Sequence, residues 1–165
     1  MANLEEISGY SLDEETQEKL FAVQRLCVVC WTTSEGWPVG VHHRYLWAKG
    51  RVWVTTSRQR HRVNALIRRP ESCVVIGGEG TELGPDRTLT FKTRATVHED
   101  RETLEWFLPR FCEAIHPDSP EAAAGMQAMM DTPRRVVIEL EPVKTISYDG
   151  GKLTEAIIRE GVDSL

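Results

Sequence analysis

The stretch TTSRQRHRVNALIRRP, residues 55–70, gathers five arginines and one histidine without a single acidic residue. The chain as a whole has the opposite sign, with a formal net charge of −5. Guanidinium groups bind carboxylates and phosphates through charge-assisted hydrogen bonds. Nucleic-acid-binding proteins usually carry a basic domain or face. A local basic island in an acidic chain therefore indicates a site for a small anion, and we expect no nucleic-acid partner.

The first half of this stretch joins a predicted strand, which ends in three hydroxyl residues, to a predicted helix that begins at about residue 59 or 60. A helix N-terminus offers free N–H groups and a partial positive charge. Hydroxyl groups, guanidinium groups and helix-start amides at one place suit a phosphate group, although the glycines of a P-loop are missing. The predicted anion site consists of Thr55, Thr56, Ser57, Arg58, Arg60 and Arg62.

The second half of the stretch ends the same predicted helix. Arg68 and Arg69 lie in its last turn, where a cation complements the helix dipole, so their charges require no ligand. Val63, Leu66 and Ile67 form one apolar stripe that we expect to be buried. A helix buried on that side is poorly suited to lie on a nucleic acid.

The histidines and cysteines do not form a metal site by spacing. His42 and His43 are neighbours on a predicted strand, so they face opposite sides and cannot chelate an ion together. The same alternation separates Cys27 from Cys30 in the sequence CVVC, so we interpret both as structural thiols. His42 and His43 remain weak candidates for a catalytic acid, and no metal is predicted.

The apolar pattern predicts the elements that position these residues. Strands are expected at 27–33, 39–47, 51–57, 72–79, 87–99 and 134–149. Helices are expected at 11–26, at about 60–69, at 100–115 and after Ser119. Ser11 and Glu14 form a capping-box pattern, and Pro109 should kink or split the third helix. The first three strands should form an antiparallel meander, because their connections are too short for crossovers.

Taken together, the pattern predicts one mainly β domain over 1–165, a small antiparallel barrel with a helical insertion at about 99–131. No apolar run approaches the roughly 18 residues of a membrane span. The acidic N-terminus lacks the pattern of a signal peptide, so we expect a cytoplasmic protein without membrane contact.

The order of these parts resembles the pyridoxamine 5′-phosphate oxidase-like family of flavin-binding split barrels, over roughly residues 12–148. The carrying motifs are the turn EGWP after the first strand, the turn WAKG after the second, and TTS at the end of the third. The fourth is LIRRPESCVVI, in which a basic helix closes with an arginine-rich turn and a proline before the next strand.

The resemblance implies a homodimer of six-stranded antiparallel split β-barrels that binds FMN at the dimer interface. In such proteins the end of the third strand and the entry to the helix hold the cofactor phosphate, here Thr55, Thr56, Ser57, Arg58 and Arg62. Arg62 stands where many relatives have a lysine. His42, His43 and Arg44 would lie near the flavin ring, where relatives read Pro-Val-Trp or similar.

The function implied is an oxidoreductase that transfers hydride or electrons to or from a small organic substrate. Two alternatives stay open. One is a reductase that uses the deazaflavin coenzyme F-420, whose longer anionic tail suits the extra arginines around residue 60. The other is a cofactor-binding protein without catalytic activity.

Overall fold

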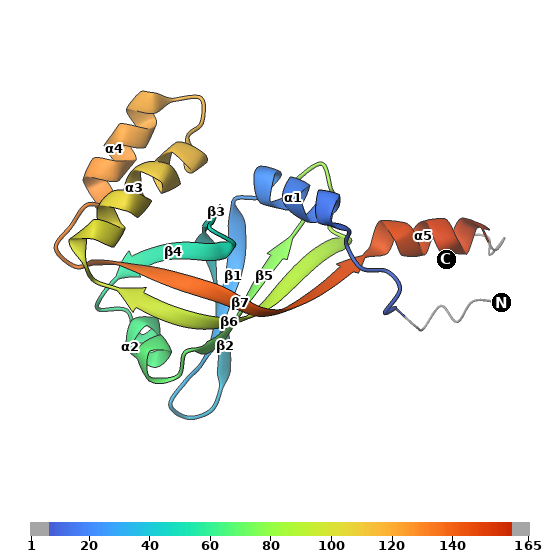
Figure 1. The fold of residues 1–165 in the computed structure, drawn as a ribbon, viewed down its shortest axis with the longest axis horizontal. Helices are drawn as coiled ribbons and strands as arrows, with labels where there is room; N and C mark the ends of the chain where they lie inside the picture. The colour runs from blue at the N-terminus through green and yellow to red at the C-terminus, as the bar shows by residue number, and fades with distance from the viewer. Residues whose placement is uncertain (1–6, 160–165) are drawn as a thin grey trace. The chain divides into compact units, whose positions relative to one another are not determined.

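The computed structural model describes residues 7–159, which form seven strands and five helices (Figure 1). The strands are β1 (Leu26–Thr32), β2 (Pro38–Arg44), β3 (Leu46–Ala48), β4 (Arg51–Ser57), β5 (Glu71–Gly77), β6 (Arg87–His98) and β7 (Arg135–Asp149). The helices are α1 (Glu14–Val23), α2 (His61–Arg68), α3 (Arg101–Ile115), α4 (Pro120–Met130) and α5 (Gly150–Arg159). None of the helices in this range is long and apolar enough to cross a membrane.

The described chain divides by its contacts into two compact units. One unit comprises Arg25–Val74 and Lys92–Lys144, and we call it the site unit because it contains every residue of the predicted anion site. The other comprises Val75–Phe91 with the described parts of Met1–Gln24 and Thr145–Leu165. Strands β5, β6 and β7 contribute residues to both units.

All seven strands belong to one sheet, in the order β2-β1-β5-β6-β7-β4-β3. Its two edge strands, β2 and β3, are consecutive in the chain and are separated only by the buried residue Tyr45. A chain that steps from one edge of a sheet to the other across one residue requires the sheet to curl until its edges meet. This is the antiparallel split barrel, so the predicted fold class is confirmed.

The predicted second strand, 39–47, is wrong in one respect. It breaks at Tyr45 into two strands with different partners, which gives seven strands instead of six. Strand β2 pairs with β1, whereas β3 pairs with β4. The first three predicted strands are therefore paired antiparallel in sequence order, as expected. The break at Tyr45 places the two pairs at opposite ends of the strand order, which alternating hydrophobicity cannot reveal.

The helical insertion packs on the outside of β4 and β7. Trp53 and Val137 join Phe107, Leu108 and Phe111 of α3 in one buried cluster. Figure 1 shows α3 and α4 as a helical hairpin beside β4. This packing covers one face of β4, while the opposite face, with Val52 and Val54, is fully buried in the barrel.

Three predicted helix details need correction. Helix α1 is capped by Asp13, whose Oδ1 accepts a hydrogen bond from Thr16 N at 2.8 Å, and not by Ser11. Helix α3 is not split at Pro109, because buried side chains on both sides of the proline hold it against the sheet. Helix α5 begins with the Gly-Gly pair itself, in a segment for which the local pattern predicts no helix.

Candidate functional site

Helix α2 begins without a side-chain cap and buries only part of its predicted apolar stripe. Arg60 is its N-cap in an extended conformation, and no side chain caps the free N–H groups of the first turn. Val63 and Leu66 are buried at 0% and 1% exposure, as expected, but Ile67 is 50% exposed. The buried stripe is therefore narrower than predicted. It contains Val63 and Leu66 but not Ile67, which points about 100° round the helix axis from Leu66.

Arg62 is the most unusual cation of the stretch. One guanidinium nitrogen, Nη2, donates a hydrogen bond to Thr56 Oγ1 at 3.0 Å, while the buried Nε has no partner. Within residues 7–159 no carboxylate forms an ion pair with Arg62. Burial, and then the charge of Arg60, lower the pKa of Arg62. An unneutralised, partly buried guanidinium beside a hydroxyl group is chemically suited to an anionic ligand.

His43 lies close enough to Arg62 for the two groups to interact electrostatically. Its side chain is half-buried, and Nε2 is buried without a hydrogen-bond partner. Burial, and then the positive charge of Arg62, lower the pKa of His43 to about 4. The imidazole is therefore neutral at physiological pH. We call His43, Thr56 and Arg62 the anchor cluster.

The other two candidates on β2 do not join this cluster. His42 and Arg44 are both exposed and point to the face of the strand opposite His43. Strand geometry dictates this separation, because successive side chains alternate. A ligand held by the anchor cluster thus meets His43, and the structure does not bring His42 or Arg44 to the same place.

The remaining candidates differ in how far their polar groups are already used. Thr55 Oγ1 donates to the carbonyl of Val136 at 2.7 Å, so this hydroxyl serves the β4–β7 pairing. Ser57 is half-buried and Arg60 is exposed. The Thr55 hydroxyl group is therefore already used within the sheet, whereas Thr56 and Ser57 remain candidates for binding the predicted anion.

Arg58 already has partners within the chain. Its Nε donates to Glu99 Oε1 at 2.7 Å, and its Nη1 donates to Asn64 Oδ1 at 2.8 Å. Asn64 lies on α2 within the same stretch, whereas Glu99 follows β6, 41 residues from Arg58. The structure thus adds a neutralising carboxylate that spacing alone did not reveal.

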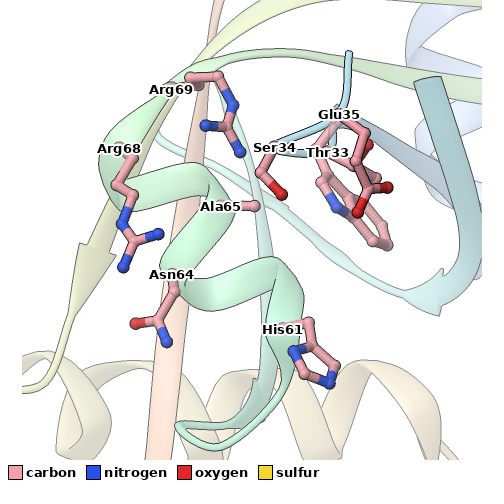
Figure 2. Close-up of a pocket in the computed structure, with 9 residues that line it drawn as sticks. Thr33, Ser34, Glu35, His61, Asn64, Ala65, Arg68 and Arg69 are labelled. Atoms are coloured by element: carbon pink, nitrogen blue, oxygen red, sulfur yellow. The ribbon is translucent and has the colours of Figure 1, made fainter. Parts of the chain in front are cut away.

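A separate pocket of about 320 Å³ lies between α2 and the turn that joins β1 to β2. Figure 2 shows the guanidinium of Arg69 directed toward Ser34, with His61 at the opposite end of the pocket. Arg69 Nε also donates to the carbonyl of Thr32 at 3.1 Å. Arg68 and Arg69 therefore line a pocket whose lining contains no residue of the anchor cluster.

Comparison with known proteins identifies the family of this fold. A family model described as pyridoxamine 5′-phosphate oxidase matches residues 12–148. No curated protein sequence is detectably similar to the chain.

Solved structures share the fold at low sequence identity. A conserved hypothetical protein from Mycobacterium tuberculosis is 19% identical, with a TM-score of 0.75 over 89% of this chain and 91% of that one. A protein named F-420 reductase is 15% identical, with a TM-score of 0.59 over 78% and 94%. The haem storage protein HutZ from Vibrio cholerae is 15% identical, with a TM-score of 0.62 over 82% and 94%. These likenesses show a shared fold, and the neighbours' names refer to different cofactors.

Proposed function

Because the chain belongs to the pyridoxamine 5′-phosphate oxidase family, we propose that it is an FMN-dependent oxidoreductase that acts on a small organic substrate. We further propose that it works as a homodimer with the cofactor at the interface. The observation that carries the proposal is Arg62, whose guanidinium is partly buried, lies against Thr56 and has no carboxylate partner among residues 7–159.

The residues present fit the phosphate group of such a cofactor. Arg62 has an unpartnered Nε, and the uncapped start of α2 adds backbone N–H donors and a partial positive charge. An anion at this position would satisfy donors that the protein leaves open. Arg62, Thr56 and Ser57 would hold the phosphate, and Arg58 would contribute less because Glu99 already neutralises it.

A bound flavin supplies the hydride or electron transfer itself. The protein residues bind and orient it. His43 stays neutral because its pKa is about 4, so its ring can donate one hydrogen bond and accept another. Its unpartnered Nε2 is available to a ligand atom, whereas a charged imidazolium beside Arg62 would be repelled.

A reductase that uses coenzyme F-420 is the second candidate. The fold is shared with a protein named F-420 reductase. In addition, Arg60 is exposed, and within the described residues it has no ion-pair partner. Cations of this kind suit a cofactor that carries further carboxylates beyond its phosphate.

The decisive experiment titrates the purified full-length protein with FMN, coenzyme F-420 and haem in parallel, and then measures turnover with a reductant. We expect saturable FMN binding and reduction of an electron acceptor that depends on FMN. Preferential F-420 binding would favour the second candidate. Haem binding without binding of either flavin would contradict both candidates, and FMN binding without turnover would leave a cofactor-binding protein.

A further inference from the structure

Two cysteines that are far apart in the sequence meet on neighbouring strands of the site unit. Cys30 lies on β1 and Cys73 on β5, which are adjacent in the sheet. Both are free and half-buried, and both line a groove of about 430 Å³ on the sheet surface. The partner of Cys30 is therefore Cys73, and not Cys27 of the CVVC sequence.

The two thiols lie close enough to influence each other's pKa. Burial raises the pKa of each thiol, and the Cys30 thiol raises that of Cys73 further. Both sulfurs are therefore protonated at neutral pH. Protonated thiols are poor nucleophiles, which argues against a reactive catalytic cysteine here.

Gly40 has no side chain beside Cys30, and the positively charged Lys92 lines the same groove. Gly40 lies opposite Cys30 in the β1–β2 register, and a Cβ at that position would come within 3.1 Å of Cys30 Sγ. Lys92 lines the same groove and lowers the pKa of Cys73. Glu71, the carboxylate of the groove, already pairs with Arg94 at 3.3 Å.

The groove offers two thiols to one ion. A disulfide requires Cβ atoms about 3.5–4.5 Å apart, which is closer than the about 4.5–5.5 Å typical of residues directly opposite each other on adjacent strands. Two sulfurs held across strands suit an ion of low coordination number between them. Thiolates select soft ions such as Cu(I). Within residues 7–159 no group of three or more His, Cys, Asp or Glu side chains is arranged for a metal, which disfavours a four-coordinate zinc site.

We propose that Cys30 and Cys73 form a two-coordinate site for a soft monovalent metal ion, Cu(I), in the groove beside Lys92. Binding forms two S–Cu bonds and releases two thiol protons, and no electrons are transferred because copper enters as Cu(I). The complex of two thiolates with one monovalent cation carries one negative charge, which the ammonium group of Lys92 balances. The site is separate from the proposed flavin anchor and does not depend on it.

The test is an anaerobic titration of the full-length protein with Cu(I) against a colorimetric Cu(I) chelator. We expect one Cu(I) per chain, and at least a hundredfold weaker binding in both Cys30→Ser and Cys73→Ser. Below the pKa of both thiols, each pH unit should strengthen the apparent affinity by about a hundredfold, because two protons are released. The buried thiols of Cys27 and Cys112 remain in both variants and serve as internal controls.

Two further measurements keep the result interpretable. Thermal unfolding of both serine variants should match that of the parent. If a serine variant does not fold, the alanine variant at the same position, Cys30→Ala or Cys73→Ala, takes its place. Lys92→Met should weaken Cu(I) binding severalfold at neutral pH. Parental Cu(I) affinity in either cysteine variant overturns the proposal. So does ready formation of a Cys30–Cys73 disulfide, seen as the loss of two hydrogen masses, without Cu(I) binding.

Discussion

The two ends of α2 carry similar charge but have different surroundings. At the start, Arg62 is partly buried beside Thr56 and His43 and pairs with no carboxylate of the described part of the chain. At the end, Arg69 contacts a backbone carbonyl and Arg68 is exposed to solvent. A guanidinium that is withdrawn from water and left unneutralised retains a strong preference for an anion, whereas an exposed one is already satisfied by water. Burial, and not the number of arginines, therefore distinguishes the proposed ligand site.

The largest expected effect comes from Arg62→Ala. Hydrogen bonds to charged groups contribute about 1.5–3 kcal/mol, so the Kd for FMN should rise about ten- to a hundredfold. The free energy of unfolding should change by only about 1 kcal/mol, because one hydrogen bond, to Thr56, is lost. Isothermal titration and chemical denaturation measure the two quantities.

Arg68→Ala is the matched control for this variant, since it removes the same charge from the same helix. Its Kd for FMN should stay within about twofold of the parent, as for an exposed charge that contributes little. An equal loss of affinity in both variants would show that the whole helix attracts the cofactor by net charge, and the division of the stretch would be wrong.

The second prediction concerns His43 and pH. Its pKa is about 4 in the folded chain and near 6.5 when unfolded, so between these values the unfolded state binds more protons. The free energy of unfolding should therefore increase as the pH rises from about 4 to 6.5. His43→Gln should flatten this part of the profile, measured by urea denaturation across the range. His42→Gln should keep the parental slope, and identical profiles for both variants would contradict the burial of His43.

Much of this arrangement was predictable from local patterns, and the rest depends on long-range partners. The strand alternation around Trp53 and Val54, and the turn from Thr56 into α2, follow from neighbouring residues. The alternation of β2 also separates His43 from His42, but it does not say which of the two faces inward. The pairing of Arg58 with Glu99, 41 residues away, requires the end of β6 to reach α2. No spacing within a strand or helix contains that information.

The third prediction tests that long-range pair. Glu99→Gln should release Arg58 for the ligand and lower the Kd for FMN about two- to fivefold, within the range of about 0–1 kcal/mol measured for surface ion pairs. Glu105→Gln is the control, because Glu105 forms a similarly exposed ion pair with Arg101. It changes the net charge equally without freeing Arg58. A tighter Kd in both variants would mean that net charge, and not Arg58, produced the effect.

The smallest expected effects separate the neighbouring hydroxyl groups of Thr55 and Thr56, which are both buried on β4. Thr55→Val removes the hydrogen bond to the Val136 carbonyl and should lower the free energy of unfolding by about 1 kcal/mol, with no change in the Kd for FMN. Thr56→Val removes the hydroxyl oxygen that accepts a hydrogen bond from Arg62 and orients its guanidinium. The Kd for FMN should rise about threefold, because the binding free energy lost is similar to that of one neutral hydrogen bond. Both replacements preserve shape, so packing is nearly constant between them. If the Thr55 variant were the one that weakened FMN binding, the cofactor would lie on the α3 side of β4, and Arg62 would not be its anchor.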